Sequence, residues 1–340
     1  MPKKLLTVLL VMACNGDKDT PDTNETIPIE ETGLPDTDTG SDTGDTVECT
    51  AQVVDVEPIN GQTEWYYRDP VTVILDEPLF AEAQVTALAN GVEVPVSVQT
   101  DDTGLKASVI PEAGAWDGST TYALSIDLCG AVHESDFTTS LYGAGLSVAA
   151  SDLTGNTYYV DMSEATYTQP AGVGTIIRQF LTNPLLIDIT NASDESLTII
   201  GAQGQIDEVT AEVTQDTRYE TWDFGSAAFD TQPYFSATAN ETTFTYVGQD
   251  IPVYDFSFDG TFSPDASTIG GMNFSGLGDT RYMGPLLNLG NSPSATCDLL
   301  GSVGVECIPC RDKEVYCVML VGFFEDAALL PDIDVEIVTK

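Results

Sequence analysis

The chain has 340 residues, of which 42% are hydrophobic, and its 54 Asp and Glu residues against 11 Lys and Arg give a formal net charge of −43. This length suggests two domains at about 100 to 200 residues each. So acidic a surface repels the phosphates of nucleic acids and anionic lipid head groups, which excludes broad contacts with either, whereas it attracts divalent cations.

The N-terminus combines three features of an exported protein. Lys3 and Lys4 are followed by an apolar run over residues 5–12 and then by Ala13-Cys14. The run is shorter than the roughly 20 residues that span a bilayer. Charge, apolar run and Ala-Cys in this order resemble a bacterial lipoprotein signal peptide. The resemblance implies that residues 1–13 are removed and that Cys14 receives acyl chains such as palmitate.

The residue after the lipid cysteine bears on location. Asn15 stands where the resemblance would place an aspartate in a lipoprotein retained at the inner membrane. The sequence therefore predicts a lipid-anchored envelope protein, with the outer membrane favoured over the inner one.

Residues 14–48 are predicted to form a disordered acidic tether. They are rich in Asp, Thr, Pro and Gly and contain no aromatic residue, so they cannot bury enough surface to offset the entropy of ordering. Alternating aspartates at 36–45 raise the alternative of a calcium loop. The pattern lacks the glutamate that closes an EF-hand loop, which argues against that alternative.

Residues 49–140 read as a β-sandwich because short alternating runs are separated by turn residues. Strands are expected at 52–61, closed by a turn, at 71–79, ending at a proline, and at 92–98, 106–110, 121–128 and 131–138.

Several of these stretches resemble a bacterial Ig-like domain of the S-layer type. They are Val56-Glu57-Pro58 with Asn60-Gly61, Leu75-Asp76-Glu77-Pro78-Leu79, Thr120-Thr121-Tyr122-Ala123-Leu124 and Asp136-Phe137-Thr138-Thr139. The resemblance implies a seven-stranded Greek-key sandwich that serves as a spacer or adhesion module, without catalytic residues. Cys49 lies just before the first strand and Cys129 between the last two, and we expect them to form a disulfide.

Residues 141–340 are predicted to form a second, β-rich domain. Strands are expected at 157–162, 185–190, 196–201, 208–213, 242–247, 253–258, 267–274, 315–324 and 334–338, with helices at 173–181 and 293–300. Antiparallel strands in this number favour a barrel or a sandwich, and a lipocalin-like barrel is the specific version.

A barrel of that kind could carry a ligand. Tyr254, Phe256 and Phe258 alternate along one expected strand and should share one face. They would either line a cavity for an apolar small molecule or simply fill the core.

Six cysteines remain after Cys14, an even number suited to disulfides in an oxidising compartment. Cys297, Cys307, Cys310 and Cys317 could instead hold zinc, but only one C-x-x-C pair is present where a zinc ribbon shows two. No thioredoxin-like pattern surrounds that pair, which argues against a redox site. We expect two structural disulfides, with three connectivities open.

Other candidates for chemistry are weak. His133 is the one histidine and lies on an expected surface strand, so a His-dependent triad is excluded from the C-terminal domain unless the two domains meet there. Abundant carboxylates give no support to glycoside hydrolysis. Arg178, Arg218, Arg281 and Arg311 should pair with neighbouring carboxylates such as Asp223 or Asp279. Trp222 belongs either to a recognition loop or to a packed strand.

The sequence thus predicts an all-β chain: an Ig-like sandwich at 49–140 and an antiparallel barrel or sandwich at 141–340 with one or two short helices. We expect no enzyme, cofactor or metal site. The leading function is a structural, adhesion or interaction module at the cell surface, with a protein or glycan as partner. The alternative is a lipocalin-like carrier.

Overall fold

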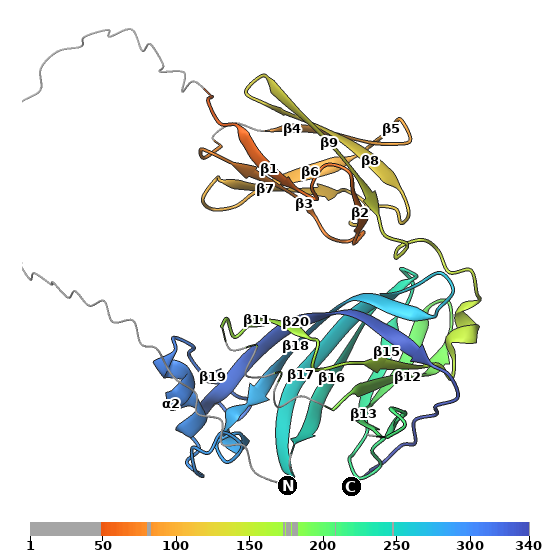
Figure 1. Ribbon diagram of the computed structural model, residues 1–340, viewed down its shortest axis with the longest axis vertical. Coiled ribbons are helices and arrows are strands. Elements are labelled where there is room, and N and C mark those ends of the chain that lie inside the picture. The colour runs from red at the N-terminus through yellow and green to blue at the C-terminus, as the bar shows by residue number, and fades with distance from the viewer. Residues whose placement is uncertain are drawn as a thin grey trace, which may run out of the picture. The chain divides into compact units, whose positions relative to one another are not determined.

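The computed structural model describes residues 49–340 except 80–82, 173, 175–177, 179–182, 208, 247 and 340. The predicted signal peptide, Cys14 and the tether lie outside the described residues, as does most of the predicted helix at 173–181. Residues Glu48–Lys340 form one compact unit, and the described elements are almost all strands (Figure 1). The all-β prediction is confirmed.

The N-terminal half is a sandwich of two sheets. Its strands are β1 (Val53–Glu57), β2 (Gln62–Trp65), β3 (Val71–Leu75), β4 (Gln84–Ala89), β5 (Val92–Val94), β6 (Val96–Thr100), β7 (Lys106–Pro111), β8 (Thr121–Leu128) and β9 (Ala131–Thr139). One sheet has the order β1-β3-β7-β6 and the other β2-β9-β8-β4-β5. All of the described pairs are antiparallel apart from β2 with β9.

The sandwich core follows from alternation along the strands. On β8, Tyr122, Leu124, Ile126 and Leu128 are all buried because successive side chains point to opposite faces. The Trp116 ring packs edge-on against Tyr122, with ring centroids 4.9 Å apart. These side chains belong to one hydrophobic cluster that spans both sheets.

The strand predicted at 92–98 is wrong in one respect. It is two strands, and Pro95 separates them. Because proline has no N–H to donate to a ladder, the chain leaves one sheet at this residue and enters the other. β5 therefore pairs with β4, whereas β6 pairs with β7.

The C-terminal half is built on one sheet of eleven strands. They are β10 (Thr157–Val160), β11 (Thr166–Gln169), β12 (Leu185–Ala192), β13 (Ser196–Ile206), β14 (Val213–Gln215), β15 (Trp222–Ala228), β16 (Tyr234–Tyr246), β17 (Gln249–Phe262), β18 (Thr268–Asp279), β19 (Ile308–Pro309) and β20 (Val315–Leu330). The main order is β14-β13-β12-β10-β20-β18-β17-β16, with β15 on β13 and both β11 and β19 on β20. Short helices are η1 (Ala150–Leu153), η2 (Thr280–Tyr282) and α2 (Ala295–Ser302).

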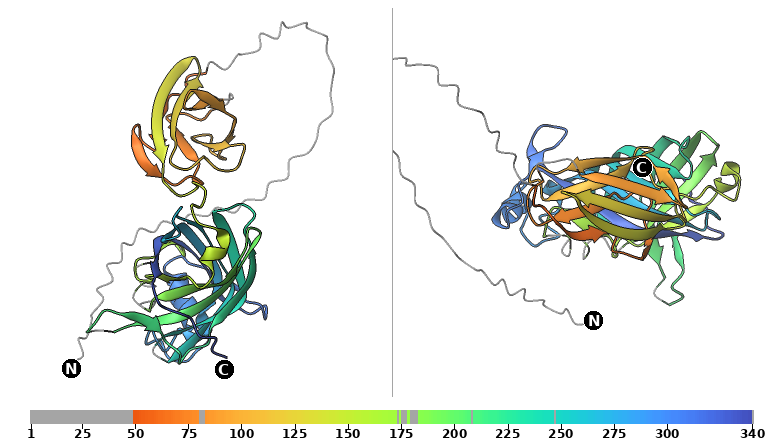
Figure 2. Two further views of the ribbon diagram at one scale, coloured as in Figure 1. Left: turned by 90° about the vertical axis from the view of Figure 1, so that its right-hand side faces the viewer. Right: turned by 90° about the horizontal axis from the view of Figure 1, so that it is seen from above.

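This sheet curls until β15 and β16 lie beside each other (Figure 2). Side chains of β15 and of β13 bridge to β16 at this closure. The Trp222 indole N–H donates to the Thr243 carbonyl at 3.2 Å. The Gln203 amide donates to the Thr245 carbonyl at 2.8 Å and accepts from the Thr245 N–H at 3.3 Å, so it substitutes for one rung of a ladder. We call this element the rolled sheet.

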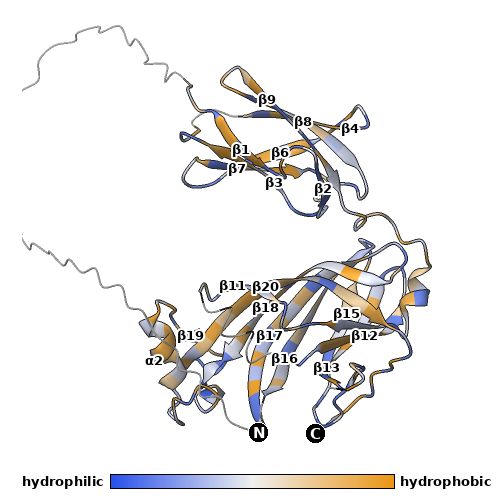
Figure 3. Cartoon of the chain, viewed as in Figure 1, coloured by the Kyte–Doolittle hydropathy of each residue, from blue (hydrophilic) through white to orange (hydrophobic). Residues whose placement is uncertain are grey.

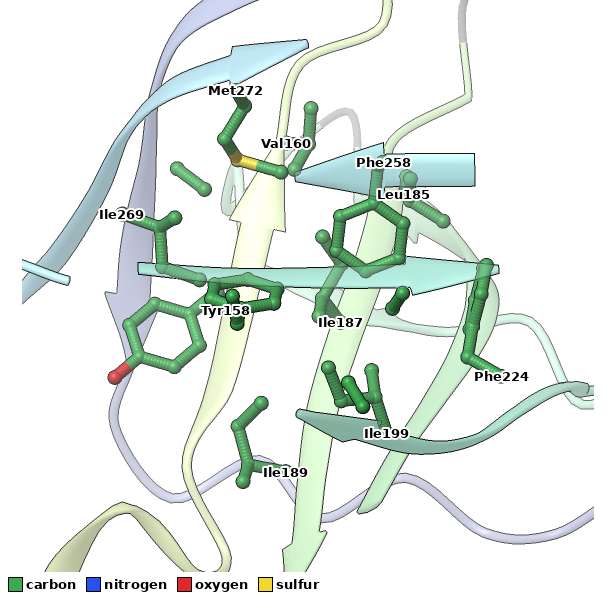
Figure 4. Close-up of a cluster of buried hydrophobic side chains, with 14 of the residues drawn as sticks. Tyr158, Val160, Leu185, Ile187, Ile189, Ile199, Phe224, Phe258, Ile269 and Met272 are labelled. Carbon is green, nitrogen blue, oxygen red and sulfur yellow. The ribbon is translucent and has the colours of Figure 1, made fainter. Parts of the chain in front are cut away.

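Aromatic and aliphatic side chains fill the interior of the rolled sheet (Figure 4). Phe262 and Phe235 stack with ring centroids 5.1 Å apart, and Phe224 meets Phe258 edge-on at 4.8 Å. Hydropathy colouring shows apolar residues alternating with polar ones along several of these strands (Figure 3). Burying such rings is worth about 1.5–3 kcal/mol each, so this core is the main source of stability in this half.

Three predicted elements of the C-terminal half differ from the structure. The strand expected at 208–213 is not formed: residues 209–212 are a turn and loop before β14, because the Asp207 carboxylate accepts from the Val209 and Thr210 N–H groups and fixes a turn. The helix expected from Pro293 begins at Ala295, with Ser294 rather than Ser292 as its N-cap. The segment expected as a strand at 334–338 joins no sheet. It is extended instead, and its Glu336 N–H donates to the Gln215 side-chain oxygen at 2.7 Å.

Alkaline pH should destabilise the fold through Tyr158. This side chain is fully buried, its hydroxyl donates to the Ala266 carbonyl at 2.8 Å, and burial raises its pKa to about 12. The folded state therefore favours the neutral phenol: this contribution is complete below pH 10, the unfolded pKa, and is lost as the pH rises toward 12.

Raising the pH from 9 to 11 lowers the free energy of unfolding of the parent protein partly because Tyr158 ionises only in the unfolded chain. Tyr158→Phe lacks this term, so its free energy of unfolding, measured with urea, should fall by about 1 kcal/mol less over the same pH range. Equal losses in the two proteins would contradict this assignment.

Candidate functional site in the disulfide lobe

All six cysteines after Cys14 are paired in the structure. Cys49 is bonded to Cys129, the expected partner, with Cα atoms 5.3 Å apart. This bond closes a span of 80 residues, which would contribute about 4 kcal/mol in the loop-entropy account. Cys297 pairs with Cys307 and Cys310 with Cys317. Of the three connectivities left open by the sequence, the structure has the one in which each cysteine pairs with the next cysteine along the chain. Neither bond leaves a thiolate for zinc.

The last two disulfides define a compact segment, Asp279–Cys317, which we call the disulfide lobe. It contains η2, α2, β19 and the start of β20. The first bond ties α2 to the loop before β19, and the second crosses the turn between β19 and β20. The Thr280 hydroxyl, fully buried, donates to the Tyr316 carbonyl at 2.6 Å and fixes η2 against β20.

Arginine–carboxylate pairs run across the lobe. Arg281 contacts buried Asp279 through Nη2 at 2.6 Å and exposed Asp312 through Nη1 at 2.6 Å. These two carboxylates raise the pKa of the Arg281 guanidinium above its usual range. Arg311 contacts Asp255 of β17 at 2.6 Å on the surface. The predicted pairing of Arg281 with Asp279 is confirmed. Arg218, by contrast, pairs with Asp216.

Both arginines also lie over aromatic rings. The Arg281 guanidinium carbon is 5.5 Å from the centre of the Tyr316 ring, and that of Arg311 is 5.3 Å from the Tyr254 ring. Such cation–π contacts add to the ion pairs where the ring is partly shielded from water.

Several large apolar side chains of the lobe and the adjoining strand are exposed, among them Tyr282, Val315 and Met319. A rigid surface with exposed apolar groups and paired charges is suited to contact with another molecule.

The expectation that Tyr254, Phe256 and Phe258 share one face is wrong for Tyr254. Register with β18 shifts between Tyr254 and Ser257, and Asp255 adopts a positive φ of 50°. A bulge of this kind shifts the alternation by one residue. Val253, Phe256 and Phe258 therefore point into the core, whereas Tyr254 faces outward under Arg311.

Phe256 and Phe258 meet other rings in the interior. Phe256 lies 5.6 Å from Phe244 and Phe258 4.8 Å from Phe224, measured between centroids. A cavity lined by Gln203, Trp222 and Phe244, among others, has a volume of about 10 Å³. That is the space of about one water molecule, and it could not hold an apolar ligand.

The remaining candidates have structural roles. His133 is an exposed residue of β9, as expected. Trp222 is buried on β15 with its ring 4.6 Å from Phe244, which makes it a packed strand residue. No cluster of three metal-binding side chains occurs among the described residues, and no helix there is long and apolar enough to cross a bilayer.

Sequence reasoning missed the outward Tyr254–Arg311 contact. The bulge that creates it has no glycine, and the signal that could have indicated it is the Asp at position 255, since Asp tolerates a positive φ better than most residues.

Comparisons with known proteins identify no family. No protein-family model matches the chain, and neither does any curated protein. Among solved structures, the N-terminal part of the bacterial S-layer protein SbsC is similar at 13% identity and a TM-score of 0.21, over 48% of this chain and 42% of that one. Similarity at this level assigns neither a common fold nor a function.

The buried ion pair of Arg281 with Asp279 should contribute more to the free energy of unfolding than the exposed pair of Arg311 with Asp255. Arg281→Met would leave Asp279, which is fully buried, without its counter-charge, so we expect a loss of about 3 kcal/mol in the free energy of unfolding.

Arg311→Met is the matched control, because both partners of that pair are substantially exposed, and it should cost less than about 1 kcal/mol. Denaturant unfolding of both variants measures the difference. Similar losses would show that burial of Asp279 does not set the strength of the pair.

Proposed function

We propose that this chain is a lipid-anchored envelope protein that acts as a structural or interaction module without catalysis. The observation that carries the proposal is the cysteine pairing. The three disulfides use the six cysteines that follow Cys14, and the seventh is the residue that the signal sequence reserves for lipid. Stable disulfides belong to oxidising compartments outside the cytosol.

The architecture supports a role in display and contact. The two halves of the described chain have separate, well-filled hydrophobic clusters, and the interior rings of the rolled sheet pack against one another. The groups available to a partner are therefore on the surface. The disulfide lobe, with exposed Tyr282 and Met319, is the part we assign to contact with a protein or glycan.

The charge supports the same placement. A formal net charge of −43 keeps a tethered protein away from anionic head groups and soluble beside the membrane. Divalent cations at the acidic surface would reduce its self-repulsion. In this proposal the outer membrane is the site of the anchor.

Replacing Cys14 tests the anchor. Cys14→Ser should move the protein from the membrane fraction to the soluble fraction, because a single residue carries every acyl chain. The measurement is cell fractionation with immunoblotting, together with incorporation of labelled palmitate.

The matched control is Cys49→Ser with Cys129→Ser, which removes a disulfide and leaves the anchor. Tight membrane association of Cys14→Ser, or labelled palmitate still attached to it, would overturn the proposed anchor.

The proposed compartment has its own test. In protein taken from the envelope and unfolded without reductant, an alkylating reagent should label none of the six cysteines after Cys14, and mass spectrometry of the fragments should recover three disulfides. Full labelling would place the chain in a reducing compartment.

A further inference from the structure

Two tyrosines of the sandwich lie directly on two adjacent glycines of β18. Tyr66 follows β2 and Tyr142 follows β9. A Cβ placed on Gly270 would lie 2.3 Å from Cζ of Tyr142, and one on Gly271 would lie 2.1 Å from Cζ of Tyr66. Both distances are far below van der Waals contact, so only glycine admits the rings here.

The backbone itself does not require glycine at position 270. Gly271 has a positive φ of 59°, which favours glycine for conformational reasons. Gly270 has no positive φ and pairs in register with Thr261 and with Asp326 like an ordinary strand residue. The ring of Tyr142 is therefore what accounts for the missing side chain at Gly270.

Hydrogen bonds fix both rings in place. The Tyr66 hydroxyl lies 2.8 Å from the Thr261 hydroxyl, which is fully buried. The Tyr142 hydroxyl donates to Asp326 Oδ1 at 2.6 Å and lies 3.0 Å from the Thr268 hydroxyl. These partners come from three strands of the rolled sheet: β17, β18 and β20.

Two further contacts surround the tyrosines. The Arg68 guanidinium carbon lies 3.7 Å above the centre of the Tyr234 ring, a close cation–π distance. The N–H of Ser147 donates to the Pro264 carbonyl at 2.7 Å and holds the segment after Tyr142 on the rolled sheet. Close ring packing, hydrogen bonds and a cation–π contact therefore occur together where the sandwich meets the rolled sheet.

We propose that Tyr66, Arg68 and Tyr142, seated on Gly270 and Gly271, form a joint that makes the sandwich and the rolled sheet move as one rigid body. Domains connected by a short segment usually move independently unless a specific interface holds them. The joint supplies that interface, so contacts made by the disulfide lobe are held at a fixed orientation to the sandwich. The inference does not rest on the proposed function.

Chemical modification of tyrosine tests the joint in the full chain with its disulfides intact. The Tyr66 hydroxyl reports on opening, because it bonds the buried Thr261 across the joint and is shielded while the joint is closed. Gly270→Ala should force the Tyr142 ring away and accelerate nitration of Tyr66, followed by peptide mass spectrometry, by at least about tenfold. Tyr158, which is fully buried within the rolled sheet, should stay unmodified in both proteins.

Gly145→Ala is the matched control. It lies in the connecting segment, and a Cβ there would meet nothing within 4 Å. Nitration of Tyr66 in Gly145→Ala should stay within about twofold of the parent protein. If Tyr66 is modified no faster in Gly270→Ala than in Gly145→Ala, the two halves are not held by this joint.

A milder variant covers the case in which Gly270→Ala fails to fold, as judged by circular dichroism. Tyr142→Phe keeps the ring but removes its hydrogen bonds to Asp326 and Thr268. The rate of Tyr66 nitration should then rise about threefold, since part of the interface remains. An unchanged rate in Tyr142→Phe would contradict the proposal.

Discussion

Packed aromatic rings fill the rolled sheet, and Phe262 lies among them. It stacks on Phe235 and also meets Phe229 and Tyr158, which come from strands and loops far apart in the sequence. A curled antiparallel sheet needs its concave face covered, and here the cover comes from its own side chains. These rings pack against one another in the interior, whereas Tyr282 and Met319 of this half are exposed on its surface.

Side-chain amides form hydrogen bonds to backbone groups that the strand ladders leave without a partner strand. The Gln203 amide makes both hydrogen bonds of a ladder rung with Thr245, and the Gln215 side chain does the same for Glu336 near the C-terminus. The two disulfides of the lobe act over short spans, where the backbone is otherwise held by turns. These local constraints hold segments that contribute few side chains to the hydrophobic core.

Much of the fold is predictable from the sequence because it depends on local periodicity. Alternation predicts β8 with its buried Tyr122 and Leu124, and the parity of the cysteines predicts complete disulfide pairing. Events at single residues are not predictable in this way. Pro95 moves the chain between sheets, and the bulge at Asp255 turns Tyr254 outward, so each reverses a pattern that was correct on both sides of it.

Long-range contacts were the least accessible to sequence reasoning. Gly270 and Gly271 fall within the strand expected at 267–274, and nothing local indicates that two tyrosines more than a hundred residues earlier lie on them. Arg281 with Asp279 could be predicted, since a spacing of two residues places them together, whereas Arg311 with Asp255 spans 56 residues. The candidate lobe was therefore recognisable by its cysteines, but its surface was not.

The central claim is that an exported, lipid-bearing Cys14 precedes a fully disulfide-bonded body. Intact-mass analysis of the protein from the membrane fraction, without reduction, tests it most directly. The account predicts a chain that begins at Cys14, carries the mass of its acyl groups and lacks six hydrogens because of three disulfides. A mass that retains residues 1–13, with free thiols and no acyl groups, would contradict it.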